Sequence, residues 1–459
     1  MEKRSRETLG SRLGFIFLSA GCAIGLGNVW RFPFIAGQYG GAAFVLLYIF
    51  FLLFFALPIL VMEFAVGRAS QRSVSQSFSV LCPQHKVWGL WGYAGWLGCC
   101  LLMMYYTVVT GWMLAYMWHS ATGRLEGLTP DQVGAAFGGL VSDPHATAAW
   151  LFLAVLIGFL VCCAGLRKGV ERVTKMMMSG LLIIMLALAV RSVTLPGAEK
   201  GLSFYLKPSL DNLMKSGLWT SVYAALGQSF FTLGLGVGSM AIFGSYISRQ
   251  RSLMGESLVV AGLDTFVAFT AGLIIFPACF AYNINPGAGP GLIFVTLPNM
   301  FNQLPQGRIW STLFFLFMSF AALSTVIAVF ENVIACFMDK FGWSRMRASA
   351  VTCLGLFALS LPCAFGFNIW SGFQPLGPGS NVLDLEDFIL SNNILPVGTT
   401  IYILFCVTRY GWGWDNFIRE VDAGTGLKFP KLLRGYLTYV APLVMLAILI
   451  VGYWEKFFK

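Results

Sequence analysis

The stretch SRLGFIFLSAGCAIGLGNVWRFPF, residues 11–34, is apolar enough to enter a bilayer but is unsuited to one continuous helix. Its helix-breaking residues are Gly21, Gly25, Gly27 and Pro33. Inside a helix, glycine costs about 1 kcal/mol relative to alanine, and proline about 3 kcal/mol. In hydrocarbon, an interrupted backbone persists only where it packs against protein or lines a polar cavity. The stretch therefore predicts a broken spanning helix that contributes to a binding site.

Small residues also let neighbouring helices approach closely, and this alternative accounts equally well for the glycines. It accounts less well for Asn28 and Arg31, which follow them in the same stretch. A polar amide and a guanidinium are costly inside an apolar segment and usually mark a pathway or a site. These two residues favour the binding-site interpretation.

The composition indicates an all-α polytopic membrane protein. Of 459 residues, 57% are hydrophobic and 11% are charged, whereas soluble proteins carry about 25% charged residues. The net charge of +10 does not indicate nucleic acid, because the basic residues cluster in alternate connections and form no separate basic domain. The eleven cysteines show no zinc-type spacing and are interpreted as packing residues.

At about 20 apolar residues per span, the chain predicts eleven transmembrane helices. They are expected near residues 13–37, 42–66, 88–119, 147–164, 174–194, 219–246, 256–281, 309–337, 348–366, 387–408 and 435–454. Most Lys and Arg residues fall on one side if the N-terminus is cytoplasmic, which sets the orientation. The long, apolar, turn-rich connection 282–308 is expected to fold onto the protein, either as a lid or as a packed connector.

A second broken helix is expected in the sixth span, where Gly234, Gly236 and Gly238 follow Phe231 and Thr232. It comes five spans after the first, so the two broken helices run in opposite directions. This is the arrangement of an inverted 5+5 repeat, whose site lies between the broken helices near the midplane. The predicted division is a cytoplasmic segment 1–12, a first repeat 13–194, a second repeat 219–408 and an eleventh helix 435–454.

Polar groups at membrane depth are suited to sodium. A dehydrated sodium ion needs about five or six oxygens, which carbonyls of unwound backbone and side chains of Asn, Ser, Thr or Asp provide. Asn28 and Thr232 lie at the two breaks, and Asp264 lies in the seventh span. An intramembrane carboxylate is a functional-site hypothesis by default. Ser324 and Thr325 in the eighth span are weaker candidates, because such hydroxyls usually bond to their own helix.

The same breaks suit a zwitterionic substrate. Free N–H groups at half-helix starts attract a carboxylate, and free C=O groups at half-helix ends attract an ammonium. Tyr106 is a candidate donor to the substrate carboxylate, with a packing role as the alternative.

Charges near the two mouths suggest gates. Arg31 and Asp387 lie toward the outer face, and Arg6 and Asp339 toward the inner face; a solvated surface charge is the alternative for each. The three histidines are scattered, and no phosphate loop, metal spacing or nucleophile elbow is present in the sequence, so no enzyme is predicted.

The segments GSRLGFIFLSAGCAIGLGNVWRFPF, GQSFFTLGLGVG and AALST resemble the neurotransmitter:sodium symporter family, whose bacterial members have the LeuT-type fold. The resemblance covers nearly the whole chain. It implies two sodium sites, a substrate pocket and two gates. The first sodium site would use Ala23, Asn28, Thr232, Asp264 and the substrate carboxylate. The second would use Gly21, Ile24, Ala321, Ser324 and Thr325.

The resemblance also places the pocket and the gates. The substrate would touch Ala23, Gly25, Tyr106, Phe231, Thr232, Gly234 and Thr325, with Leu102, Val237 and Val329 lining the side-chain pocket. Arg31 and Asp387 match the outer gate, with Tyr106 and Phe231 as a thin lid. The inner gate is matched by Arg6, Tyr246 and Asp339.

Departures from familiar members refine these expectations. Gly25 replaces the Asp of amine carriers, which favours an amino acid over a monoamine. Asp264 replaces a frequent Asn, and Ala268 lacks the side chain that helps to hold or replace chloride, so chloride independence is expected. Gly234 and Val237 replace Ser and Phe of the leucine carrier, which predicts a roomier pocket for a large hydrophobic or aromatic amino acid.

The sequence therefore predicts a sodium-coupled amino-acid symporter of the bacterial inner membrane that works by alternating access. Its expected partners are an amino acid, sodium ions and the lipid bilayer, without nucleic acid; the oligomeric state is left open. The alternative is an amino-acid-binding sensor or ligand-gated conductance, which would bind without accumulating substrate against a gradient.

Overall fold

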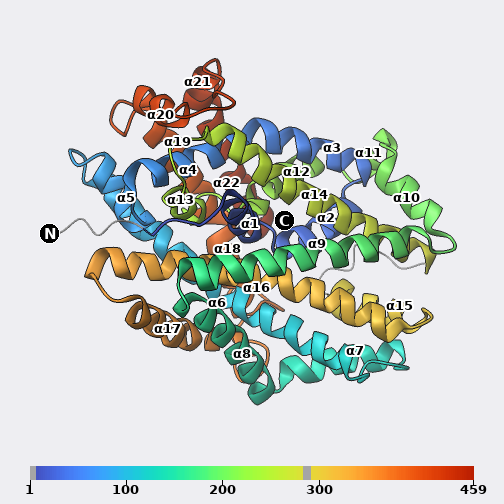
Figure 1. Ribbon diagram of the computed structural model, residues 1–459. Coiled ribbons are helices and arrows are strands. Elements are labelled where there is room, and N and C mark those ends of the chain that lie inside the picture. Colours follow the sequence, from blue (N-terminus) through green and yellow to red (C-terminus); the bar gives the residue numbers. More distant parts are fainter. Residues whose placement is uncertain (1–6, 283–290, 459) are drawn as a thin grey trace.

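The computed structural model describes residues 7–282 and 291–458, which are predominantly helical (Figure 1). Nine helical stretches in these ranges are long and apolar enough to cross a membrane, and one bent pair of helices raises the number to ten. The all-α polytopic architecture predicted from composition is confirmed. A count of eleven is not confirmed by length and composition, because the sixth span is broken into two short helices.

The first span is broken where the glycines predict it. It consists of α1 (Arg12–Ala23), the π-helical turn η1 (Gly27–Arg31) and α2 (Phe32–Gln38), and its two halves meet at 57°. The Ser11 side chain caps α1 by accepting a hydrogen bond from the backbone N–H of Gly14. Ile24 and Gly25, which lie between α1 and η1, are the non-helical part of this span.

The sixth span is broken in the same manner. Helix α12 (Leu218–Thr232) ends at the predicted polar residue, and α13 (Ser239–Gly244) begins after six intervening residues. The intervening Gly234, Gly236 and Gly238 have φ of 59°, 102° and 74°. Glycine alone adopts such angles at no steric cost, so the glycine triplet permits this break.

The remaining spans are continuous, although several contain a π-helical turn. They are α3 (Ala42–Phe51), η2 (Leu52–Ala56) and α4 (Leu57–Ser70); α6 (Val87–Ala121); α8 (Pro144–Cys163); η3 (Leu166–Glu171) and α9 (Arg172–Val193); α14 (Leu253–Ala281); α16 (Gly307–Phe341); α17 (Arg345–Phe365); α18 (Val382–Ile389), η5 (Leu390–Ile394) and α19 (Leu395–Val407); and α21 (Leu433–Gly435), η6 (Tyr436–Val440) and α22 (Ala441–Phe457).

Shorter helices lie at the two ends of the bundle (Figure 1). One end carries α5 (Val74–Leu81) and α20 (Trp414–Val421), close to the start of the described chain. The opposite end carries α7 (Pro130–Ser142), α10 (Ala198–Leu206), α11 (Leu210–Lys215) and α15 (Leu297–Asn302), which follows the π-helical turn η4 (Leu292–Thr296). Successive connections thus alternate between the ends, as the charge pattern predicts.

The connection 282–308 folds onto the protein where the structure describes it. Leu292, Ile293 and Phe294 are fully buried, and the ring of Phe294 stacks on that of Phe137 with 4.6 Å between centroids. Residues 283–290 of this connection lie outside the described ranges. The expected packing is therefore present in its second half.

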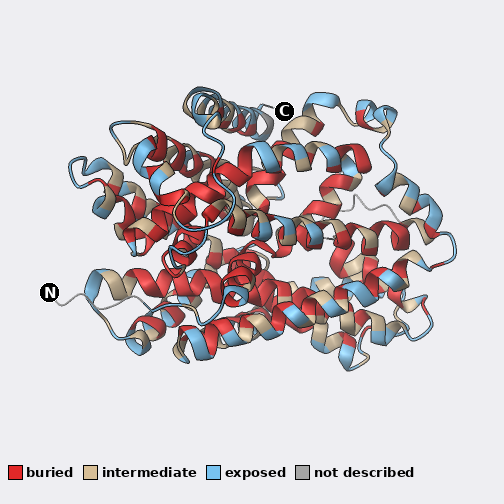
Figure 2. Ribbon diagram, turned by 45° about the horizontal axis from the view of Figure 1, so that its top comes forward, coloured by how far each residue is buried: buried red, intermediate tan, exposed pale blue. Residues whose placement is uncertain are grey.

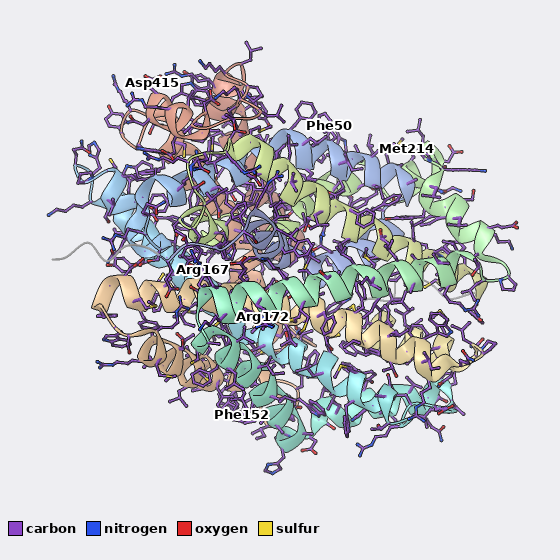
Figure 3. All side chains as sticks on the ribbon, in the orientation of Figure 1. Phe50, Phe152, Arg167, Arg172, Met214 and Asp415 are labelled. Atoms are coloured by element: carbon purple, nitrogen blue, oxygen red, sulfur yellow. The ribbon has the colours of Figure 1, made fainter. Side chains whose placement is uncertain are left out.

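The core follows the central helices. Helices α6 and α16 pack against each other along their length, and α1 packs on α16. Figure 2 shows the buried residues concentrated on these inner elements, with exposed residues on the outer faces. Large apolar side chains point outward from peripheral spans, as Phe50 and Phe152 do on opposite sides of the molecule in Figure 3. Such outward apolar faces suit a lipid environment.

Candidate functional site

The two broken spans meet at a buried carboxylate on α14. Asn28 of η1 donates from Nδ2 to the Asp264 carboxylate (2.8 Å, Oδ1), to the Asp264 carbonyl (3.2 Å) and to Thr232 Oγ1 (3.0 Å). Thr232, the last residue of α12, donates its hydroxyl to Asp264 Oδ2 at 2.9 Å. The three side chains that the sequence placed at membrane depth on three spans are thus brought together.

Asp264 is fully buried and carries a formal charge that no basic side chain balances. Among the described residues, no Lys, Arg or His forms an ion pair with it. Burying an isolated carboxylate is costly, and two polar partners only partly offset that cost. A carboxylate, a hydroxyl and an adjacent carbonyl are oxygen ligands of the kind that hard cations take. The cluster is therefore suited to a monovalent cation.

A second group of oxygens lies where α16 meets the end of α1. Thr325 donates its hydroxyl toward the carbonyls of Gly21 (3.2 Å), Cys22 (3.4 Å) and Ala321 (3.3 Å). Ser324 donates to the Ala321 carbonyl at 2.9 Å. Two side-chain hydroxyls and three backbone carbonyls thus lie close together here, without a carboxylate. Four of the five residues predicted for the second sodium site belong to this group. Its fifth predicted member, Ile24, is fully buried directly after α1.

A cavity of about 300 Å³ opens between these clusters and one face of the molecule. This is the lower end of the size range of small-molecule sites. Nine of the ten residues predicted to bind substrate line it: Ala23, Gly25, Leu102, Tyr106, Phe231, Thr232, Gly234, Val237 and Thr325. Val329 is buried but does not line the cavity. The lining is mostly apolar, with few polar groups.

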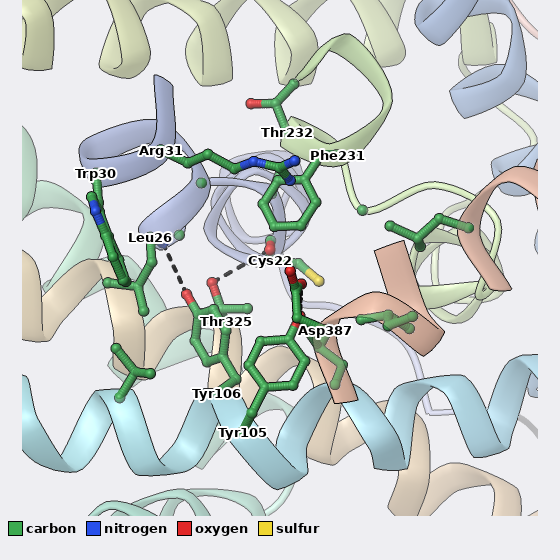
Figure 4. A pocket seen from close by; sticks show the side chains of 18 of the residues that line it. Cys22, Leu26, Trp30, Arg31, Tyr105, Tyr106, Phe231, Thr232, Thr325 and Asp387 are labelled. Carbon is green, nitrogen blue, oxygen red and sulfur yellow. Dashed lines mark hydrogen bonds between the residues drawn. The ribbon is translucent and has the colours of Figure 1, made fainter. Parts of the chain in front are cut away.

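Gly25 leaves the room that the cavity needs at the first break. A Cβ atom at this position would lie 2.4 Å from the Tyr106 hydroxyl oxygen and 2.9 Å from Thr325 Oγ1. The Tyr106 hydroxyl accepts a hydrogen bond from the backbone N–H of Leu26 at 3.1 Å, which Figure 4 marks with a dashed line. The tyrosine thus satisfies part of the unwound backbone and borders the cavity.

The second break is supported by a carboxylate that the sequence analysis missed. Glu63 of α4 is fully buried and accepts hydrogen bonds from the backbone N–H of Gly236 (2.5 Å) and of Met240 (3.3 Å). Gly236 lies in the segment between α12 and α13, and Met240 lies in the first turn of α13, where N–H groups lack helical partners. A glutamate within the apolar segment VMEFAV was the available signal.

At the mouth of the cavity, Arg31 and Asp387 both line the wall but do not form an ion pair. The Arg31 guanidinium lies over the Phe231 ring, 3.9 Å from its centroid. Asp387 Oδ1 accepts hydrogen bonds from the Tyr105 hydroxyl (3.2 Å) and the Ser391 hydroxyl (2.7 Å). Figure 4 shows Asp387 beside Tyr105, with Phe231 beneath Arg31. The predicted outer-gate pair thus faces one cavity, with each residue held by another partner.

At the opposite end, two of the three residues predicted for the inner gate, Tyr246 and Asp339, belong to two polar networks. Tyr246 donates its hydroxyl to the buried Glu331 at 2.8 Å, and Arg345 bridges Glu331 (2.7 Å) and Glu7 (2.6 Å). These last three residues were not predicted.

Asp339 belongs to the second network. It accepts from the Ser73 backbone N–H at 2.7 Å and lies 3.9 Å from an Arg72 nitrogen. The predicted Arg6 lies outside the described residues. The polar contacts at this end therefore include more charged groups than the resemblance implied.

The arrangement of two broken spans around buried oxygens agrees with comparisons to known proteins. A model described as the sodium:neurotransmitter symporter family matches residues 6–130 and 140–456. The chain belongs to this family. Its members are transporters, which confirms the prediction that this chain is not an enzyme.

Individual relatives extend over almost the whole chain. A Bacillus subtilis protein described as an uncharacterized sodium-dependent transporter, YhdH, is 35% identical over 405 residues and covers 88% of both chains. A sodium-dependent transporter of Haemophilus influenzae is 31% identical over 461 residues, covering 97% of this chain and 98% of the relative. Both relatives are described as uncharacterized sodium-dependent transporters.

A solved structure matches the fold closely. The crystal structure of MhsT in complex with L-phenylalanine superposes with a TM-score of 0.87 at 37% sequence identity, covering 98% of this chain and all of that one. The predicted membership of the symporter family and the LeuT-type fold are therefore confirmed. The family is also one of multi-pass membrane proteins, in agreement with the spans described above.

Proposed function

We propose that this family member imports a large hydrophobic or aromatic amino acid together with sodium, by alternating access and without a requirement for chloride. The observation that carries the proposal is the fully buried Asp264 carboxylate, which Asn28 and Thr232 contact from the two broken spans and which has no basic partner among residues 7–282 and 291–458. A sodium ion is the cation that the family transports. Binding it there offsets the buried charge and links both breaks through one ion.

Two sodium ions are proposed as cargo. The first would use Ala23, Asn28, Thr232, Asp264 and the substrate carboxylate, and the second Gly21, Ile24, Ala321, Ser324 and Thr325. Because the substrate carboxylate completes the first set, an amino acid and sodium would bind cooperatively. The membrane potential adds about 2.3 kcal/mol per 100 mV for each charge moved.

Chloride independence follows from the fixed charge of Asp264. A carboxylate in place of an amide supplies permanently the negative charge that a bound chloride would otherwise supply beside sodium. Ala268, one helical turn further along α14, is fully buried and offers no polar side chain to hold an anion. These two positions support independence from chloride.

The substrate class is inferred from the cavity. Leu102, Val237 and the glycine at position 234 make its walls apolar and leave about 300 Å³. The related MhsT was crystallised with L-phenylalanine, which supports an amino acid of that size for this chain. Gly25 leaves space for the substrate's own carboxylate where a side-chain carboxylate would otherwise lie.

The gates, the repeat division and the location complete the proposal. Arg31 with Asp387 would close the outer side, and Arg6, Tyr246 and Asp339 the inner side. The first, second, sixth and seventh spans, drawn from the repeats 13–194 and 219–408, would rock against the other spans. The protein would lie in a bacterial inner membrane with its N-terminus in the cytoplasm.

Uptake into proteoliposomes tests the proposal. Labelled phenylalanine and leucine are supplied with an inward sodium gradient or an equal potassium gradient, with chloride or gluconate as the anion. We expect accumulation that requires sodium and is unchanged in gluconate. Asp264→Asn should lose or weaken it, whereas Asp415→Asn, which changes an exposed carboxylate on α20, should not.

A sensor or conductance that binds without accumulation is the alternative. Sodium-dependent binding in the absence of accumulation would support it and contradict symport. Uptake that is equal in sodium and potassium would contradict the assigned sodium sites.

A further inference from the structure

A gate made of Arg31 and Asp387 alone does not explain why Asp387 accepts hydrogen bonds from two other side chains. Asp387 lies on α18 and accepts two hydrogen bonds on the same oxygen, Oδ1. One donor is Tyr105 of α6, a buried residue of another span, and the other is Ser391, one turn further along its own segment. Among the described residues, no donor contacts Oδ2. One carboxylate oxygen is thus fixed while the other stays available.

The opposing cation is placed to use the available oxygen. Arg31 ends the π-helical turn η1 and lines the same cavity as Asp387. Its guanidinium rests on the Phe231 ring at 3.9 Å, a cation–π contact that leaves its N–H donors at the edge of the group accessible. Hydrogen bonds from an arginine to a carboxylate are about twice as strong as those between neutral groups. Holding one partner in its bound orientation beforehand reduces the cost of forming the pair.

From these contacts we propose that Tyr105 and Ser391 are positioning residues of the outer gate. They hold the Asp387 carboxylate so that Oδ2 receives Arg31 when the cavity closes. Closure then requires no reorientation of the Asp387 carboxylate, because Tyr105 and Ser391 already hold it. The π-helical turn η5 begins at Leu390 and carries Ser391, so an irregular part of the helix supplies one of the two donors.

This inference rests on the proposed function, in which the outer gate closes over sodium and an amino acid. In this proposal, Tyr105 and Ser391 do not bind the charged groups of the substrate. Their effect would pass through the Arg31–Asp387 pair, and this makes it separable from a general effect on folding.

A double-mutant cycle tests the proposal, with protection of a cavity thiol as the measured quantity. Cys22 lines the cavity, so its reaction with an impermeant thiol reagent added from the outer side reports whether the mouth is open. The Cys22→Ser variant gives the background from other cysteines. The readout is the phenylalanine concentration that half-protects the thiol in saturating sodium.

We expect Ser391→Ala and Tyr105→Phe each to raise this concentration about tenfold, since a hydrogen bond to a charged group is lost. Ser391→Thr, which keeps the hydroxyl, should restore it. In an Arg31→Gln background the same changes should have less than about a twofold effect, because the interaction they support is absent. Tyr439→Phe, which alters an exposed tyrosine of η6, is the matched control.

Three results would overturn the proposal. Unchanged protection in both variants would show that the hydrogen bonds of Tyr105 and Ser391 to Asp387 do not affect closure. Protection at lower phenylalanine would show that they hold the gate open. An equal loss with and without Arg31 would show a purely structural role. Wild-type protein that shows no sodium-dependent protection would instead contradict the proposed function, and this inference with it.

Discussion

The Thr232 hydroxyl donates a hydrogen bond to Asp264 Oδ2 at 2.9 Å, joining the end of the broken α12 to the middle of α14. The other oxygen of the same carboxylate contacts Asn28 of the first break. One buried charge therefore links both discontinuities. An ion bound here would contact both broken spans and α14 at once.

Replacing Asp264 with Asn should weaken sodium binding. The amide removes the only carboxylate of the cluster, and contacts to a charged group contribute about 1.5–3 kcal/mol, or about 10- to 100-fold. We expect half-maximal uptake at a sodium concentration higher by about that factor, together with stimulation by chloride. Sodium titrations in chloride and in gluconate measure both. An unchanged sodium dependence would contradict the assignment of Asp264.

Adding one methyl group at Gly25 should impair substrate binding. The Cβ of Gly25→Ala would lie 2.4 Å from the Tyr106 hydroxyl, so the tyrosine must move away from the Leu26 backbone N–H. Overpacking of this kind costs about 1–3 kcal/mol, so we expect about a tenfold or greater loss of apparent affinity. Phenylalanine competition measures it. Gly227 lies in α12 of the other broken span, and a Cβ atom there would meet no neighbouring atom within 4 Å, so the Gly227→Ala variant should bind phenylalanine normally.

Filling the pocket wall should change the size of the preferred substrate. Val237 lines the cavity and is 1% exposed, so Val237→Phe would place a ring in the proposed side-chain space. We expect competition by phenylalanine to weaken about tenfold relative to that by alanine, the cost of overpacking. Val259→Phe, at a position 40% exposed on α14, is the control. Equal weakening for both substrates would place Val237 away from the substrate side chain.

Replacing one of the two acceptor oxygens of Glu63 by an amide nitrogen should destabilise the protein. The Glu63→Gln amide has one acceptor oxygen, so it leaves the N–H of either Gly236 or Met240 facing another donor. A buried unsatisfied group costs about 1–3 kcal/mol, and we expect a lower Tm in a fluorescence melt. Glu199→Gln, an exposed change on α10, should melt like the wild type. A wild-type Tm for Glu63→Gln would show that the second break does not depend on this carboxylate.

Much of the fold was predictable, because long apolar segments predict the spans, and glycine and polar residues inside those segments predict where a span is broken. The third span, expected at 88–119, is α6 at Val87–Ala121, and the sixth, expected at 219–246, ends at Gly244. Its division into two short helices is what keeps a count by length and composition below eleven.

The site was less completely predictable, because supporting contacts depend on the relative placement of helices. Tyr105 adjoins the predicted Tyr106 but points about 100° away around the helix, toward Asp387, which sequence spacing alone does not reveal. Glu331 reaches Tyr246 from 85 residues further along the chain. Both contacts require the tertiary structure.

The most direct test of the account is the simultaneous measurement of labelled sodium and labelled phenylalanine entering the same proteoliposomes. If the Asp264 cluster couples the two, each amino acid will enter with a fixed number of sodium ions, and Asp264→Asn will reduce that number. Phenylalanine entry without sodium, or sodium entry that does not depend on phenylalanine, would contradict coupled transport.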